Sequence, residues 1–99
     1  MLSTKDLFNA KNNGKKVSND LHIMAVDTGA FKDTDKDGNE VMVSCIKDTN
    51  GDIYTSISAT IYSSLEMLQQ ILDESGTTEV VVHEATSQGG RNFLQLSVI

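Results

Sequence analysis

The stretch Thr60–Gly76, which reads TIYSSLEMLQQILDESG, decides the fold of this 99-residue chain. Its apolar side chains recur at steps of three and four, which puts them on one face of a helix: Ile61, Leu65, Leu68, Ile71 and Leu72. Ser58, Thr60 or Ser63 is suited to cap the start, and Gly76 is suited to the end because glycine adopts a left-handed backbone without penalty. The sequence therefore predicts one long helix whose single apolar face must be covered by other elements.

Three segments before this helix have the composition of strands. Asp20–Thr28 (DLHIMAVDT) carries apolar residues on both faces, as expected for a strand that is covered on both sides. Val41–Lys47 (VMVSCIK) and Ile53–Ser58 (IYTSIS) flank the turn DTNGD, and an Asn-Gly pair between two β-prone runs is the strongest short signal for a hairpin. We therefore expect three consecutive strands, of which the second and third are paired.

The expected hairpin assigns a face of the sheet to each side chain of these two strands. Its pairing puts one set of residues on the core face: Met42, Ser44, Ile46, Ile53, Thr55 and Ile57. The other face is mixed, since it combines Tyr54 and Lys47 with small hydroxyl side chains. Such a face fits either a half-exposed sheet surface or a binding platform, and the sequence leaves both open.

Two further strands follow the helix, Glu79–Glu84 (EVVVHE) and Arg91–Ile99 (RNFLQLSVI), with a turn at Thr86–Gly90. The last strand alternates in polarity, and its expected inward side chains are Leu94, Leu96 and Val98. Arg91 and Phe93 then point outward, and an aromatic ring beside an arginine is typical of a surface that stacks on bases or sugars. The alternative is an edge aromatic that is covered by the N-terminal segment.

The order of the predicted elements is three strands, one helix and two strands. This order predicts a mainly β chain with one helix, folded as a five-stranded OB-fold-like barrel (β-β-β-α-β-β) whose helix caps the open end. The alternative is a different small α+β sheet with the helix on one face. In an OB-fold the binding surface lies over strands two and three, between two loops that in this chain are residues 29–40 and 85–90.

Residues 1–19 are expected to form a short helical and basic arm that precedes the barrel domain of residues 20–99. Ser3–Lys11 has the pattern of a short helix, whose first and fourth residues have the spacing of a capping pair. The segment 12–16 (NNGKK) reads as a basic turn. It serves either as a solvated linker or as an arm that contacts phosphate groups.

Net charge, apolar runs and cysteine content indicate which classes of protein this chain can belong to. The net charge is −6, which counts against non-specific binding of polyanions, although residues 1–16 are basic. No apolar run approaches the roughly 18 residues of a membrane span, and the N-terminus has no apolar signal-peptide region. Cys45 is the only cysteine, so we expect no internal disulfide and a buried thiol. These features predict a soluble intracellular protein of one domain.

The loop predicted at residues 29–40 imitates a calcium-binding loop through Asp33, Asp35 and Asp37. The imitation fails at its twelfth position, which is Ser44 rather than a glutamate, and a strand follows instead of a helix. We therefore expect no metal ion and no cofactor. The chain also lacks the Ser/His/Asp, Cys/His and zinc-binding spacings of catalytic sites, so the sequence predicts no enzyme.

Three segments resemble small single-stranded DNA-binding proteins of tailed bacteriophages: KDLFNAKNNGKKVSNDL at 5–21, IKDTNGDIYTSISATIYSSLEML at 46–68 and SQGGRNFLQLSVI at 87–99. The resemblance covers most of the chain. It implies an OB-type fold, no enzymatic activity, and binding of exposed strands during phage DNA replication in the cytoplasm of the host cell. The better-known bacterial single-strand binders end in a disordered acidic tail that recruits partners, whereas this chain ends in a strand, so we expect no recruitment of that kind.

Binding of an unpaired strand requires aromatic faces for the bases and cations for the phosphates. The predicted stacking residues are Tyr54, Phe93 and Phe31. The predicted phosphate contacts are Arg91, Lys47, Lys15, Lys16 and Lys32. Because the cations are few, we expect weak affinity at a single site, a shallow salt dependence and many protomers along one strand.

The acidic part of the chain leaves a second function open. Residues 17–99 carry thirteen acidic side chains against four basic ones, and such a surface is typical of a protein that occupies a basic cleft. The alternative is therefore an acidic phage protein that binds and inhibits a host protein. The expected partners are single-stranded DNA, further copies of this chain, and a host or phage replication protein.

Overall fold

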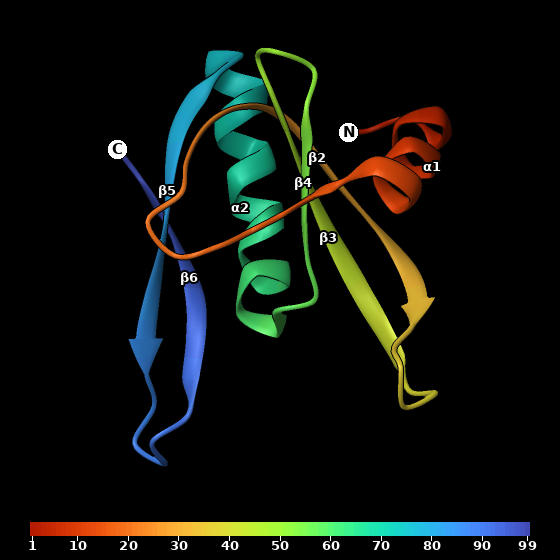
Figure 1. Cartoon of the computed structure of the whole chain (residues 1–99). Helices are drawn as coiled ribbons and strands as arrows, with labels where there is room; N and C mark the ends of the chain where they lie inside the picture. Colours follow the sequence, from red (N-terminus) through yellow and green to blue (C-terminus); the bar gives the residue numbers. More distant parts are fainter.

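Six strands form one sheet that curls as a half-barrel around a long helix (Figure 1). The computed structural model describes every residue from Met1 to Ile99. In chain order the elements are α1 (Thr4–Asn13), β1 (Lys15–Lys16), β2 (His22–Thr34), β3 (Glu40–Asp48), β4 (Ile53–Ser56), α2 (Ala59–Ser75), β5 (Thr78–Thr86) and β6 (Asn92–Val98). The strands lie in the order β1-β4-β3-β2-β5-β6, and only the β1–β4 pair is parallel.

The helix α2 confirms the prediction made from the stretch Thr60–Gly76. Ser58 is the residue that caps its start, because the Ser58 hydroxyl accepts a hydrogen bond from the amide of Ile61. Gly76 ends the helix with a φ of +79°, and its amide donates to the carbonyl of Leu72 at 2.7 Å. The buried face of α2 packs against the sheet in one core cluster, whose main members are Ile23, Ile46, Ile61, Leu65, Leu68, Leu72, Val80 and Val82.

Apart from α1 and β1, the elements follow the predicted order β-β-β-α-β-β, and the OB-fold-like architecture is confirmed. The sheet does not close into a complete barrel, because its edge strands are β1 and β6, and neither β6 and β1 nor β6 and β4 are paired, which leaves a gap between β4 and β6. At this gap the Ser58 hydroxyl donates a 3.5 Å hydrogen bond to the carbonyl of Leu94. Val17 also lies in the core cluster, so the segment that follows β1 helps to fill the interior of the open barrel.

The prediction of a basic turn at residues 12–16 is wrong in two respects. Its first two residues end α1, and Lys15 and Lys16 form β1 beside Tyr54 and Thr55 of β4. The pairing gives backbone groups of β4 hydrogen-bond partners that they would lack if β4 were the edge of the sheet. The amide of Val17 donates to the carbonyl of Thr55 at 2.9 Å in this pairing.

The prediction of a long loop at residues 29–40 is also wrong for most of that segment. β2 continues to Thr34, and only residues 35–39 form the turn to β3. Every residue from Thr28 to Thr34 is paired with a residue of β3. This continuous ladder outweighs the low strand propensity of Gly29 and Asp33, because strand preference depends on context more than helix preference does.

Three hairpins of the sheet close with the same loop geometry, at Asp35–Asn39, Asp48–Asp52 and Ser87–Arg91. The fourth residue of each loop is a glycine with positive φ: +83° at Gly38, +88° at Gly51 and +80° at Gly90. In the second loop the Asp48 carboxylate accepts hydrogen bonds of 2.9 Å from the amides two and four residues later. Such side-chain acceptors and left-handed glycines favour a loop of three residues rather than two.

The three-residue loop shifts the β3–β4 pairing by one residue from the predicted register. Tyr54 lies opposite Ile46, and Ile53 lies opposite Lys47. The predicted assignment of faces is therefore wrong for β4. Tyr54 packs against the α2 core cluster, whereas Ile53 belongs to a second cluster on the other side of the sheet.

The second cluster is covered by α1 and by the residues that precede it. Leu2, Leu7 and Ala10 pack on the outer side of β2, β3 and β4, over Phe31, Val43, Cys45 and Ile53. Cys45 is fully buried there, as predicted. The predicted capping pair of Ser3 and Asp6 is also present, as a capping box at the start of α1. The division into an arm at 1–19 and a domain at 20–99 stays a prediction about which part folds independently.

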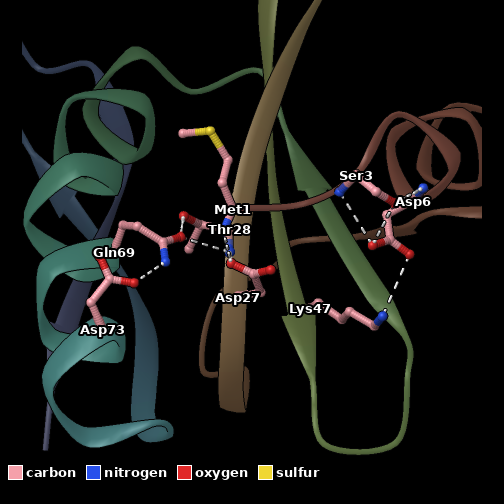
Figure 2. A network of polar contacts seen from close by, with 8 residues as sticks. All are labelled: Met1, Ser3, Asp6, Asp27, Thr28, Lys47, Gln69 and Asp73. Carbon is pink, nitrogen blue, oxygen red and sulfur yellow. Dashed lines mark hydrogen bonds and ion pairs between the residues drawn. The ribbon is translucent and has the colours of Figure 1, made fainter.

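Polar contacts fix this N-terminal segment to the sheet, as Figure 2 shows. The N-terminal amine lies 2.8 Å from the Asp27 carboxylate, and Lys47 Nζ lies 3.4 Å from the Asp6 carboxylate. Next to Asp27, the Thr28 hydroxyl donates a 2.6 Å hydrogen bond to Gln69 of α2. The N-terminus, β2 and α2 are thus joined through neighbouring residues of one strand.

The Asp6 carboxyl is the titratable group that links α1 to β3. Partial burial by itself raises its pKa, but hydrogen bonds from Ser3 and the nearby Lys47 ammonium outweigh that effect and lower the pKa below its ordinary value. A carboxyl with a lowered pKa in the folded state stabilises the fold above its unfolded pKa. This contribution is lost as the pH falls through the folded-state pKa.

We predict that Asp6→Asn lowers the free energy of unfolding at pH 7, and that the difference from the wild type shrinks well below about pH 4, where the unfolded carboxyl is protonated. Urea unfolding at neutral and acidic pH measures the difference. Asp37→Asn is the matched control, because Asp37 is exposed and is in no ion pair. An equal loss of stability at both pH values would contradict the prediction.

The hairpin loops give a second prediction, for which two neighbouring glycines form a matched pair. Gly90→Ala should destabilise the fold by about 1–2 kcal/mol, because a left-handed backbone carries that penalty for residues with a Cβ. Gly89→Ala should be nearly neutral, since a Cβ there meets only the Ser87 hydroxyl, at 3.9 Å. Urea unfolding of both variants tests the difference, and equal effects would show that the φ of Gly90 is not the cause.

Candidate nucleic-acid interface

An open groove of about 610 Å³ lies on the sheet beside the gap between β4 and β6. Its lining comes from the end of α1, β1, β3, β4, the β4–α2 junction and β6: Gly14, Lys16, Val17, Val43, Thr55, Ser56, Ile57, Ser58 and Leu94. The lining contains one cation and no carboxylate. It includes β3 and β4, the second and third strands of the OB-like order, over which such folds bind their ligands.

A larger hollow of about 680 Å³ lies between β2 and α2, but its chemistry differs. Its lining includes the carboxylates of Glu66 and Asp73 and no lysine or arginine. The N-terminal amine of Met1, the positive group at this hollow, is paired with Asp27. A polyanion is repelled by such a lining, so we take the smaller groove as the candidate interface.

The three predicted stacking residues lie on different parts of the structure. Phe31 packs against the cluster beneath α1, and Tyr54 packs against the α2 core cluster. Phe93 lies opposite Ala85 on the face of the β5–β6 hairpin that points away from Leu94 and the core. All three rings are partly exposed, but the structure does not bring them together on one surface.

The predicted cations divide into paired and unpaired groups. Lys15, Lys32 and Lys47 lie 3.0, 3.7 and 3.4 Å from the carboxylates of Asp52, Glu40 and Asp6. Lys16 and Arg91 are exposed and are in no ion pair. Lys16 lines the groove, and Arg91 lies in the β5–β6 loop, a short distance along the chain from the groove residue Leu94.

Lys15 is tied to both a carboxylate and an aromatic ring. The hydrogen bond that its ammonium donates to Asp52 raises the pKa of Lys15 above its ordinary value, so the charge is retained. Its Nζ lies 6.0 Å from the centre of the Tyr54 ring, at the outer limit of a cation–π contact. The predicted residues Lys15 and Tyr54 are therefore neighbours.

Three residues that could contact a ligand were not among the predicted binding residues. Ile57, which was assigned to the core face, lines the groove with an exposure of 63%. Thr55, on the same strand, lines it as well. Phe8 is the most exposed aromatic residue, at 67%, and it was not in the predicted set. A three-residue loop at Thr49–Gly51 is the signal that would have corrected the faces of Thr55 and Ile57, whereas exposure of Phe8 depends on how α1 docks.

Three further features bear on metal binding, thiol reactivity and membrane insertion. No group of three or more His, Cys, Asp or Glu residues is placed to hold a metal ion. The Cys45 thiol is buried, and burial raises its pKa to about 11, which removes the thiolate that a nucleophile needs at neutral pH. No helix is long and apolar enough to cross a membrane.

Comparison with known proteins identifies the family of the chain. A family model described as phage single-stranded DNA-binding protein matches residues 3–99. No curated protein and no solved structure gives a match. The match spans α1, the whole sheet and α2, and it agrees with the resemblance seen in the sequence. The chain belongs to the family of phage single-stranded DNA-binding proteins.

Proposed function

We propose that this protein binds single-stranded DNA without sequence preference during phage DNA replication, in the cytoplasm of the host cell. The observation that supports this most directly is the groove beside the β4–β6 gap, which has a lysine and no carboxylate in a chain of net charge −6. Local charge governs contact with a polyanion, because salt screens charges beyond about 8–10 Å. The acidic remainder of the surface therefore does not prevent binding at this groove.

In this proposal the backbone of the strand lies along the groove, and Lys16 and Arg91 contact its phosphates. Both cations are free of ion pairs, so neither has to give up a carboxylate partner. Lys15 and Lys32 exchange their carboxylates for phosphates when the strand approaches, whereas Lys47 keeps its ion pair with Asp6, which holds α1 on the sheet. With few contacts, the logarithm of the affinity should fall with the logarithm of the salt concentration with a slope of about −0.7 for each phosphate contact.

Stacking supplies the rest of the affinity. Phe93 is half-buried on the face of the β5–β6 hairpin that points away from the groove residue Leu94, so it stacks on a base where the strand leaves the groove and passes the hairpin that also carries Arg91. Tyr54 and Phe31 are partly exposed and stack only where the strand reaches the edges of their clusters. Each stacked base is worth about 1–3 kcal/mol by alanine substitution. Weak binding by one protomer is then offset by many protomers along a strand.

We predict that Phe93→Ala weakens binding of a labelled oligothymidine by about 1–3 kcal/mol, and that Lys16→Gln reduces the salt slope by about 0.7. Fluorescence anisotropy at two salt concentrations measures both effects. Lys36→Gln is the matched control, because Lys36 is exposed and unpaired but lies in the β2–β3 loop among aspartates.

Circular dichroism must show that the Phe93 variant is folded, since this ring is half-buried. Absence of binding by the wild-type chain at low salt would overturn the proposed function. An equal effect of Lys16→Gln and Lys36→Gln would move the interface away from the groove.

A further inference from the structure

The solvent face of α1 has the composition of a nucleic-acid contact surface. Thr4, Lys5, Phe8 and Asn12 lie at steps that place them along one side of the helix, and all four are exposed. Leu7 and Ala10 lie on the opposite side, where they pack on the sheet. The helix therefore turns Leu7 and Ala10 toward the sheet and presents its one aromatic ring to solvent, with an exposure of 67% for Phe8.

The charges around Phe8 favour a polyanion as its ligand. The one carboxylate of α1, that of Asp6, is turned toward Lys47 of the sheet at 3.4 Å. Lys5 is exposed and in no ion pair. The side-chain amide of Asn12, one turn beyond Phe8, donates a 3.2 Å hydrogen bond to the Phe8 carbonyl and so stays on the helix. An exposed ring with a free cation one turn before it matches a base flanked by a phosphate.

The C-terminal end of α1 adjoins the groove. Gly14, which ends α1, lines the groove together with Lys16. Figure 1 shows α1 leading directly into the segment that runs across the molecule toward β5 and β6. A strand that lies in the groove thus meets the end of α1 at one side of it, and its next nucleotides can follow the helix surface.

The helix is also held firmly enough to present a ring in a fixed position. The capping box at Ser3 and Asp6 orders its first turn. Ion pairs join it to the sheet at Lys47 and, through Lys11, at Asp33. Because the docking of α1 is made before the ligand arrives, less conformational entropy is lost when a base stacks on Phe8.

We propose that the solvent face of α1 is a second contact surface for single-stranded DNA, in which Phe8 stacks on a base and Lys5 contacts a phosphate. This inference rests on the proposed function and extends it to residues outside the groove. It commits to a nucleic acid as the occupant, because the face combines an aromatic ring with an unpaired cation and has no carboxylate.

Phe8→Ala should weaken binding of oligothymidine by a factor of about 5 to 100, which corresponds to the loss of one stacked base. Tyr62→Ala is the matched control, since Tyr62 is an exposed aromatic on the other helix, with Glu66 one turn away. Lys5→Gln should reduce the salt slope by about 0.7. Phe8 is exposed, so its truncation should leave the unfolding midpoint unchanged.

Phe8→Trp provides a direct readout, because the chain contains no tryptophan. This variant should retain its affinity, and its emission should be quenched by oligothymidine, whereas Tyr62→Trp should show no quenching. If the wild type binds and Phe8→Ala binds equally well, the inference is wrong while the proposed function stands. If the wild type does not bind, the proposed function itself fails.

A second copy of this chain is the other possible occupant of the α1 face, and sedimentation velocity distinguishes it from DNA. A change in the mass of the free protein on Phe8→Ala, with unchanged affinity for oligothymidine, would assign the face to self-association and overturn the inference. An unchanged mass together with weaker DNA binding would support it.

Discussion

The packing of the apolar face of α2 against the curled sheet is the contact on which the rest of the structure depends. Side chains from β2, β3, β5 and β6 reach this helix, so one stripe of leucine and isoleucine holds both ends of the sheet together. The same helix fixes the opening of the barrel, because its capping residue Ser58 also bonds to Leu94 across the gap between β4 and β6. The position of the groove is a consequence of that arrangement.

A second constraint comes from the loops. Three residues rather than two between β3 and β4 turn Ile53 to the outer side of the sheet, beside Val43 and Cys45. That side would expose a large apolar surface in water if nothing covered it. Leu7 and Ala10 of α1, together with Leu2 before the helix, cover it. The N-terminal segment is thus a structural part of the protein, and it also determines which parts of β3 and β4 remain open to a ligand.

The charged side chains fall into two groups: those that hold the fold together and those that have no partner within the protein. Asp35 and Asp48 accept amide hydrogen bonds in hairpin loops, and Asp6 and Asp27 hold the N-terminal segment. Many carboxylates therefore serve the fold, and net charge describes the binding surface poorly. Lys16 in the groove and Lys5 on α1 are both left without such partners, in the part of the chain where the sequence is locally basic.

Local pattern was sufficient for the elements whose signals lie within a few residues. The 3.6-residue periodicity of α2, its glycine stop, the capping pair of α1 and the order of the five long strands could all be read from the chain, and with them the OB-like architecture. The candidate site was less accessible. Lys16 and Arg91 could be named from residue type, but their freedom from carboxylates could not, since Asp52, Glu40 and Asp6 approach the other three cations only in the folded chain.

The amino-acid sequence alone was thus enough for the helices, the chain order of five of the six strands and the family resemblance, because periodicity, turn residues and caps act over short distances. Only the tertiary structure decided which face of each strand is covered. A shift of one residue in a hairpin exchanges the two faces of a strand, and the choice depends on the hydrogen bonds of Asp48 and on the docking of α1. The surface that remains exposed on the sheet is determined by those long-range contacts, which no local pattern encodes.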